Sequence, residues 1–174
     1  MTQLKPAAFF DRDGVINRDH GYVSQPDQFE LVEGAARALV MCREAGYLIF
    51  VITNQSGVAQ GYYEEAAIAA LHQHMVALLK DQGATIDDIR YCPHHPEARR
   101  GAYRKACSWR KPGPGMILDL AAHWPVDLQH SFLIGDKQSD MAAATAAGIR
   151  GFLYSRGPLD DFVADVLSKM RQDD

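Results

Sequence analysis

The stretch that decides the fold is Ala7-Ala8-Phe9-Phe10-Asp11-Arg12-Asp13-Gly14, a short apolar run followed at once by two carboxylates. A continuous apolar run that ends in a turn rich in Asp and Gly indicates a buried strand. Strands buried on both faces are typical of parallel sheets covered by helices. We therefore predict that residues 7–10 form a strand and that Asp11 and Asp13 stand just beyond its carboxyl end.

The remainder of the chain alternates short apolar runs with longer helical stretches, which is typical of an α/β domain with a mainly parallel sheet. Further strands are predicted at residues 47–53, 88–92, 131–134 and 151–154. Helices are predicted at residues 34–45, 64–82, 114–123, 139–147 and 160–171, and three of them are followed by a glycine that can close a helix. The sequence shows no internal repeat and no linker, so we expect a single domain over residues 1–174.

The composition limits the classes of protein to which the chain can belong. Its 174 residues suffice for one hydrophobic core, and 47% hydrophobic with 23% charged residues is ordinary for a globular protein. No apolar run approaches the roughly 20 residues that span a bilayer, and residues 1–6 do not resemble a secretory signal. Three cysteines are too few for a disulfide framework, so we expect a cytoplasmic protein. A net charge of −4 argues against nucleic-acid binding.

Three polar segments each follow a predicted strand, namely residues 11–13, 53–56 and 135–140. Open α/β sheets bind their ligands at the carboxyl ends of their strands. We therefore expect these segments, which are far apart in the sequence, to line one crevice. Their convergence indicates a site more strongly than any one of them does.

Asp11 and Asp13 offer the chemistry of a carboxylate pair. They are two positions apart, so they point to the same side if the strand geometry continues. One carboxylate can attack a phosphoryl group, and a second can protonate the leaving oxygen and later activate water. Because two such groups repel each other, we expect a cation nearby, and Mg²⁺ suits hard oxygen ligands, with Asp136 as a third. Taken alone, Asp-Arg-Asp-Gly is equally a plain turn sequence.

Other side chains near the predicted strand ends suit a phosphate group. Thr53 and Asn54 offer a hydroxyl and an amide, and the turn that follows adds backbone N–H donors. Arg110 and Lys111 are adjacent cations, and fixed positive charge favours phosphoryl transfer. Lys137 can contact phosphate or neutralise the acids beside it. Each group also has an ordinary alternative, since local Thr-Asn turns and solvated surface cations are common.

Four segments in order resemble the motifs of the haloacid dehalogenase superfamily: Asp11-Arg12-Asp13-Gly14, Thr53-Asn54, Lys111 and Gly135-Asp136-Lys137-x-x-Asp140. The resemblance covers about residues 7–156. It implies a three-layer Rossmann-like fold with a mainly parallel central sheet, and a magnesium-dependent phosphatase.

The same resemblance implies a role for each motif residue. Asp11 would be the nucleophile and Asp13 the general acid and base. Thr53 and Lys111 would stabilise the transferring phosphoryl group. Asp136 would hold Mg²⁺ together with Asp11 and the backbone carbonyl of Asp13.

Many members of this superfamily carry a cap domain after the first or second motif. Here about twenty residues separate Ile16 from the first predicted helix, and about twenty separate Cys92 from Lys111. Neither segment is long enough for an independent domain. We therefore expect no cap domain, and specificity must come from loops.

The loops in question are Asp19-His20-Gly21-Tyr22, Thr53-Asn54-Gln55-Ser56 and Arg110-Lys111, together with the run Tyr91-Cys92-Pro93-His94-His95-Pro96. They resemble loops of the heptose bisphosphate phosphatase family, which removes the C7 phosphate of D-glycero-D-manno-heptose 1,7-bisphosphate during lipopolysaccharide precursor synthesis. By that resemblance the phosphosugar would contact Asp11, Arg12, Asp13, Asp19, His20, Gly21, Tyr22, Thr53, Asn54, Gln55, Ser56, Arg110, Lys111 and Lys137. Arg110 would recognise the distal phosphate or the sugar, and the loop at residues 19–22 would close over it. We expect a monomer. The alternatives are a histidinol-phosphate phosphatase and a non-catalytic phosphosugar-binding protein.

Relatives of this type carry a structural zinc bound by Cys-x-His and, further on, Cys-x-Cys. In this chain Cys92, His94 and Cys107 match, but Trp109 stands where the fourth ligand belongs. Structural zinc sites are almost always four-coordinate. Either His95 or water completes the shell, or this metal loop, at about residues 92–109, holds no zinc. A retained but weakened site is the favoured expectation.

Three further side chains are expected to have no functional role. Cys42 lies in the first predicted helix and suits the hydrophobic core. His72 and His74 lie on a predicted helix and, being two positions apart, face different directions.

Overall fold

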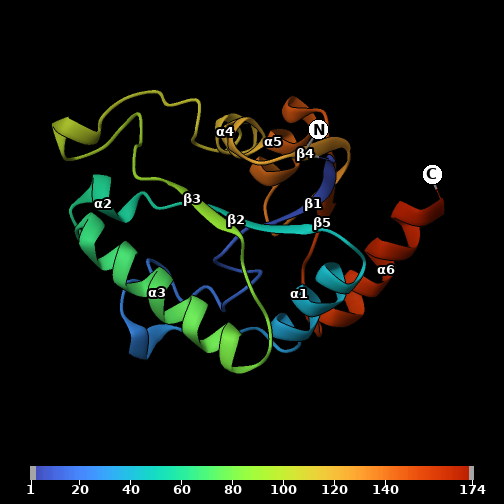
Figure 1. Ribbon diagram of the computed structural model, residues 1–174. Coiled ribbons are helices and arrows are strands. Elements are labelled where there is room, and N and C mark those ends of the chain that lie inside the picture. Colours follow the sequence, from blue (N-terminus) through green and yellow to red (C-terminus); the bar gives the residue numbers. More distant parts are fainter. Residues whose placement is uncertain (1–2, 173–174) are drawn as a thin grey trace.

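The computed structural model describes residues 3–172 and contains a five-stranded parallel sheet (Figure 1). The strands are β1 (Lys5–Phe10), β2 (Leu48–Asn54), β3 (Asp88–Cys92), β4 (Val126–Gly135) and β5 (Arg150–Leu153). Their order across the sheet is β3-β2-β1-β4-β5, so the strand that ends in the opening motif is central. The strand order reverses between β1 and β4, which is where open α/β sheets form a binding crevice.

Helices cover both faces of the sheet and complete three layers. On one face lie α4 (Gly115–His123) and α5 (Gln138–Ala147), and on the other lie α1 (Ala35–Glu44), α3 (Glu65–Asp81) and α6 (Leu159–Gln172) (Figure 1). The short helix α2 (Gly57–Gln60) follows β2, and two 3-10 turns, η1 (Pro26–Gln28) and η2 (Gly101–Tyr103), lie in loops. The predicted three-layer α/β architecture is confirmed.

The residues of β1 explain why both faces of the sheet are covered. Successive side chains of a strand point to opposite faces. Ala8 and Phe10 join the core beneath α1, α3 and α6, whereas Ala7 and Phe9 join the core beneath α4 and α5. None of the four is exposed. Since burying one Phe side chain contributes about 1.5–3 kcal/mol, β1 anchors the loop that follows it firmly.

Most predicted elements are found with shifts of one or two residues at their ends, and two differences are larger. β4 begins at Val126 rather than at residue 131, because Val126 and Asp127 pair with the start of β1 before a shift in register. Apart from Leu128, residues 127–130 are polar and are partly or fully exposed, so they do not extend the apolar run. Helix α2 is absent from the prediction, since four residues are too few to show helical periodicity.

The loop from β1 to α1 contains only η1 and the loop from β3 to α4 contains only η2 as regular structure. Within the described residues 3–172, these two loops contain no further helix or named strand. Over the described residues 3–172, none of the helices combines the length and the apolar character needed to cross a membrane.

Candidate active site

The carboxyl ends of β1, β2 and β4 bring the predicted site residues to one edge of the sheet. Asp11 is the first residue after β1, Thr53 lies at the end of β2, and Asp136 directly follows β4. Because β1 lies between β2 and β4, the three strand ends are neighbours. The three polar segments therefore meet where their positions in the sequence predict.

Lys111 is a buried cation at the floor of the site. Its Nζ lies 2.9 Å from Asp11 Oδ1 and 2.6 Å from Asp140 Oδ1, and it donates to the carbonyl of Ile52 at 3.2 Å. Burial lowers the pKa of Lys111, but the carboxylates of Asp11 and Asp140 outweigh burial and raise it above its ordinary value. The side-chain amide of Asn54 fixes the main chain here, because it exchanges two hydrogen bonds of 3.0 Å with the N–H and carbonyl of Lys111.

Three carboxylates gather around one point beside this cation. One oxygen from each of Asp11, Asp136 and Asp140 lies within 4.8 Å of the others. Burial raises the pKa of Asp11 to about 7, against the lowering effect of Lys111, and burial also raises the pKa of Asp136. Oδ1 of Asp136 is buried and has no hydrogen-bond partner. Buried carboxylates with an unpaired oxygen suit a hard divalent cation such as Mg²⁺.

The local sequence makes room for this cluster. Gly14 has a φ of +85°, and a Cβ at that position would collide with the carboxylate of Asp136. Asp140 stands in the first turn of α5, where its Oδ2 accepts the N–H of Lys137 at 3.1 Å. Asp140 belongs to the motif quoted above but was not predicted as a metal ligand, whereas the structure brings its carboxylate into the cluster.

The side chain of Asp13 is held by a separate set of donors. Its Oδ1 accepts from Arg12 Nη2 and Asn17 Nδ2, both at 3.0 Å. Its Oδ2 accepts from Arg12 Nη2 and Gln55 Nε2, also at 3.0 Å. The strand geometry assumed for Asp11 and Asp13 does not hold, because β1 ends before Asp11 and the chain turns over residues 11–14.

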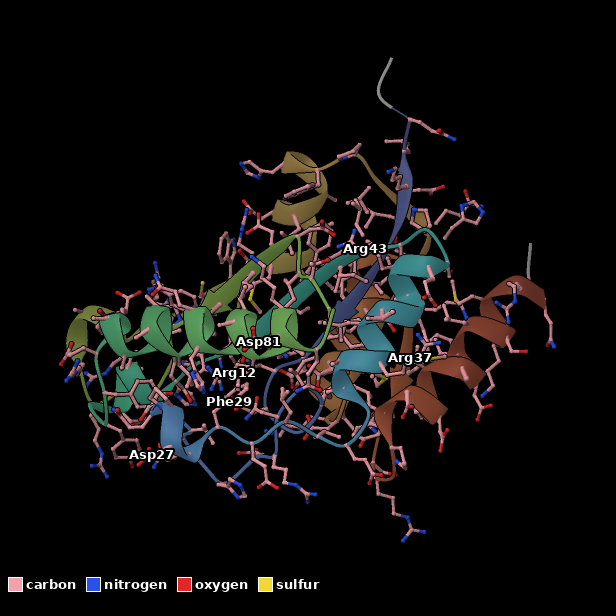
Figure 2. The ribbon with its side chains drawn as sticks, turned by 60° about the horizontal axis from the view of Figure 1, so that its bottom comes forward. Arg12, Asp27, Phe29, Arg37, Arg43 and Asp81 are labelled. Atoms are coloured by element: carbon pink, nitrogen blue, oxygen red, sulfur yellow. The ribbon has the colours of Figure 1, made fainter. Side chains whose placement is uncertain are left out.

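Arg12 lies beneath this loop and is fully buried. Its Nη2 donates to the carbonyl of Val23 at 2.9 Å, and its Nη1 lies 3.2 Å from Nε2 of His72 on α3. Figure 2 shows Arg12 beside α3. Burial, and then the charge of Arg12, lowers the pKa of His72 to about 3, so the imidazole is neutral and can accept from Arg12. His72, expected to have no role, therefore supports the loop that carries Asp11 and Asp13.

Above this floor lies a pocket of about 290 Å³. Its lining consists of Asp11, Asp13, Asp19, Gly21, Tyr22, Thr53, Asn54, Gln55, Ser56, Tyr63, Lys111, Lys137, Ser139 and Asp140. Three residues predicted to contact substrate are not part of this lining, namely the buried Arg12 described above, His20 and Arg110. His20 faces Glu30, with Nε2 and Oε2 3.4 Å apart, and Arg110 donates to the carbonyl of His94 at 3.3 Å.

The loop at residues 19–22 forms one rim of the pocket. Asp19 Oδ1 accepts the N–H of Gly21 at 2.9 Å, and its Oδ2 lies 3.7 Å from Nζ of Lys137 across the opening. Tyr22 has a φ of 51°, and its exposed ring stands edge-on to Tyr62 with centroids 4.7 Å apart. This rim therefore joins an ion pair to two aromatic rings.

Comparisons with known proteins agree with this geometry. Residues 108–168 match the family model described as HAD-hydrolase-like. The D-glycero-β-D-manno-heptose-1,7-bisphosphate 7-phosphatase of Rhodopseudomonas palustris is 53% identical over 168 residues, which cover 97% of this chain and 93% of that protein. The chain belongs to the D-glycero-β-D-manno-heptose-1,7-bisphosphate 7-phosphatase family.

Solved structures related to this heptose-bisphosphate phosphatase family member agree with its fold. A HAD-like phosphatase from Mesorhizobium loti superposes with a TM-score of 0.88 at 32% identity, covering 98% of this chain and 88% of that one. The D,D-heptose 1,7-bisphosphate phosphatase from B. bronchiseptica, complexed with magnesium and phosphate, gives 0.82 at 29% identity, covering 94% and 99%. The predicted superfamily and its fold are confirmed.

In this member of the heptose-bisphosphate phosphatase family, the loop from β3 to α4 holds an incomplete cysteine and histidine cluster. Cys92, His94 and Cys107 bring three ligand atoms within 4.8 Å of one another. Trp109 packs against the core under α4 instead of supplying a ligand. His95 is not in the cluster, and its Nδ1 accepts the N–H of Glu97 at 3.0 Å. Three side chains that could each supply one ligand to a metal ion therefore lie together, and His95, one of the alternatives for a fourth ligand, is not among them.

Sequence reasoning missed several residues of the site because nothing in their immediate sequence marks them. Asn17 and Tyr63 do not follow a predicted strand, and neither belongs to a quoted motif. They reach the site through hydrogen bonds, Asn17 to Asp13 and Tyr63 to Gln55. Cys42 is fully buried on α1, and burial raises its pKa to about 12, as expected of a core thiol.

Proposed function

We propose that the chain is a magnesium-dependent phosphatase that removes the C7 phosphate of D-glycero-D-manno-heptose 1,7-bisphosphate and leaves the C1 phosphate, in nucleotide-activated heptose synthesis. The observation that carries the chemistry is the buried trio at the pocket floor, in which Lys111 Nζ touches Asp11 and Asp140. A binding site for a dianionic phosphate would not require carboxylates at its base. Nucleophilic attack on the phosphorus, in contrast, requires a carboxylate, and here that carboxylate lies beside a cation. The substrate is inferred from the named relatives.

In the first step, an oxygen of Asp11 attacks the phosphorus of the C7 phosphate. A P–O bond to Asp11 forms and the P–O bond to C7 breaks. Asp13 donates a proton to the departing C7 oxygen, so the product leaves as an alcohol. Lys111 and the hydroxyl of Thr53 stabilise the negative charge of the transferring group.

In the second step, Asp13 accepts a proton from a water molecule that attacks the phosphorus of the aspartyl phosphate. The bond to Asp11 breaks, inorganic phosphate leaves, and Asp11 returns as a carboxylate. Asp13 thus alternates between acid and base. Four hydrogen bonds of 3.0 Å and one of 3.3 Å keep the carboxylate in one orientation at the pocket wall.

Mg²⁺ would be held by Asp11, Asp136 and Asp140, together with the backbone carbonyl of Asp13. The close set of three carboxylates and the unpaired Oδ1 of Asp136 support this assignment. When bound, the cation supplies positive charge that draws the phosphate toward the nucleophile and offsets the repulsion between carboxylates.

The sugar and the C1 phosphate would lie toward the rim. Lys137 and the 19–22 loop line that side of the pocket. Arg110 lies next to Lys111 and, by releasing the carbonyl of His94, would reach the distal phosphate as a bidentate donor. In this scheme the chain acts as a cytoplasmic monomer, and any zinc at Cys92, His94 and Cys107 is weakly held.

The test is phosphate release from three substrates with and without Mg²⁺: heptose 1,7-bisphosphate, histidinol phosphate and a hexose monophosphate. We expect Mg²⁺-dependent release with the highest kcat/KM on heptose bisphosphate, and none for Asp11→Asn. A preference for histidinol phosphate would contradict the substrate but keep the chemistry. No release from any of the three would favour a binding protein.

A further inference from the structure

Tyr63 lies between α2 and α3 and presents its side chain to the pocket. Its hydroxyl is 2.8 Å from Oε1 of Gln55. Burial raises the pKa of Tyr63 to about 12, so the hydroxyl keeps its proton and donates it to the amide carbonyl. The ring has its place because residue 57 is glycine, and a Cβ there would collide with the Tyr63 ring.

Gln55 connects this hydroxyl to two groups of the proposed reaction. It is buried, with 2% of its surface exposed. Its Nε2 donates to Oδ2 of Asp13 at 3.0 Å and to Oγ1 of Thr53 at 2.8 Å. One side-chain amide therefore has all of its polar groups engaged: the carbonyl with Tyr63 and both N–H bonds with Asp13 and Thr53.

The direction of these bonds is determined by the chemistry of the groups. The NH₂ end of an amide donates and its carbonyl accepts, so the NH₂ end of Gln55 faces Asp13 and its carbonyl faces the hydroxyl of Tyr63. Thr53 Oγ1 in turn accepts from Gln55. Its own O–H is then free to donate into the pocket, which is the direction in which a phosphoryl oxygen needs a donor.

We propose that Tyr63 is a positioning residue for the phosphatase reaction. By holding the amide of Gln55 in one orientation, it keeps the Asp13 carboxylate aligned and leaves the Thr53 hydroxyl as a donor. The inference rests on the proposed function, because it assigns Tyr63 a part in the steps performed by Asp13 and Thr53. Tyr63 itself neither exchanges a proton nor forms a bond with the substrate in these steps.

Tyr63→Phe removes one oxygen and keeps the ring against Gly57. Without that donor the side-chain amide of Gln55 can rotate. A hydrogen bond of this kind contributes about 0.5–1.5 kcal/mol. We therefore expect kcat on heptose bisphosphate to fall about 3- to 10-fold. The KM should stay within about twofold, because Tyr63 acts on aligned reacting groups rather than on binding.

The matched control is Tyr154→Phe. Tyr63 is half-buried and Tyr154 is buried, and the hydroxyl of Tyr154 donates to the carbonyl of Gly157 at 2.6 Å, outside the pocket. We expect both variants to lose similar thermal stability and only Tyr63→Phe to lose kcat. Equal kcat values for the two variants, with an active wild type, would overturn the proposal. An inactive wild type would instead overturn the proposed function.

A double-mutant cycle tests whether Tyr63 acts through Gln55. We expect Gln55→Leu to lower kcat about 10- to 100-fold, and the double variant to be no slower than Gln55→Leu alone. If Tyr63→Phe lowers kcat by the same factor in both backgrounds, the route through Gln55 is wrong.

A comparison of two substrates with different leaving groups distinguishes an effect on Asp13 from a general loss of structure. Nitrophenolate leaves without a proton, whereas the sugar oxygen needs one. Tyr63→Phe should therefore reduce kcat/KM more for heptose bisphosphate than for p-nitrophenyl phosphate. An equal reduction on both substrates would overturn the assignment to Asp13.

Discussion

At the scale of single residues, Lys111 balances the charge of two buried carboxylates at the pocket floor. It is 4% exposed and its Nζ stands between the carboxylates of Asp11 and Asp140. Removing one partner of a buried ion pair leaves an uncompensated charge, which is far more costly than losing an exposed pair. Two buried carboxylates would be left without their cation here.

We predict that Lys111→Met abolishes activity and lowers the free energy of unfolding by about 3 kcal/mol. Adding Asp140→Asn should recover part of that loss, because it removes one of the two stranded charges. Denaturant unfolding of both variants checks this, with Lys169→Met on the exposed side of α6 as the control. Equal free energies of unfolding for the wild type and Lys111→Met would show that Lys111 does not offset the charges of Asp11 and Asp140.

The placement of these residues could be predicted from sequence only where a strand end marks them. Asp11 and Asp136 each directly follow a strand, and their meeting follows from the parallel sheet. The direction of Asp13 could not be predicted, because it is set by Arg12, Asn17 and Gln55, which reach it after the chain has turned.

At the scale of elements, α3 supports both the catalytic loop and the metal loop. Near its N-terminus, Glu65 accepts hydrogen bonds from the hydroxyls of Tyr91 at 2.8 Å and Tyr103 at 2.9 Å. Glu64 accepts two from Arg100, at 2.9 and 2.6 Å. The segment that carries Cys92, His94 and Cys107 is therefore tied to the N-terminal end of α3 by side chains.

We predict that zinc contributes little to stability. Treatment with a chelator should lower the melting temperature by no more than about 3 °C, equivalent to about 1 kcal/mol for a chain of this size. Glu65→Leu should lower it further, since it leaves two tyrosine hydroxyls unpaired. Metal analysis with thermal unfolding checks this. One tightly held zinc per chain, with a large loss of stability on chelation, would show that three ligands suffice.

We also predict a pH-dependent stability from His72 on α3. The pKa of its buried ring, about 3, lies below the value of about 6.5 in the unfolded chain, so unfolding takes up a proton between these values. Stability is full above pH 6.5 and falls as the pH drops below it. Between pH 7 and pH 5 this residue should account for a loss of about 2 kcal/mol.

The comparison for this prediction is His72→Gln, which can still accept from Arg12 but does not titrate. Its free energy of unfolding, measured in urea at pH 7 and pH 5, should change by about 2 kcal/mol less than that of the wild type. If the free energy of unfolding changes by the same amount between pH 7 and pH 5 in both proteins, His72 is not held neutral in the folded chain.

Element positions were predicted where the apolar pattern is strong. Helix α3 shows helical periodicity, and β2 is a continuous apolar run that is buried along nearly its whole length. The first half of β4 was not, because Asp127 and His130 there resemble a loop. Pairing with β1 makes that half a strand, and pairing cannot be deduced from local composition.

At the scale of the whole molecule, residues as far apart in the sequence as Asp11 and Asp140 line one pocket. The order of the strands was not predictable from the sequence, although the parallel sheet was, because crossovers of similar length permit several orders. The order found places β1 beside β4 and so brings Asp11 to Asp136.

We predict that activity does not need a second copy. Specific activity should be constant over a hundredfold range of protein concentration, and sedimentation should give the mass of one chain. A specific activity that rises with concentration, together with a dimer, would show that a partner contributes to the site.

The most direct test of the central claim is which phosphate leaves heptose 1,7-bisphosphate, followed by ³¹P NMR in the presence of Mg²⁺. The account predicts that the C7 phosphate signal disappears, inorganic phosphate appears in equal amount, and the C1 phosphate signal remains. Loss of the C1 signal, or no change with active-site residues intact, would contradict it.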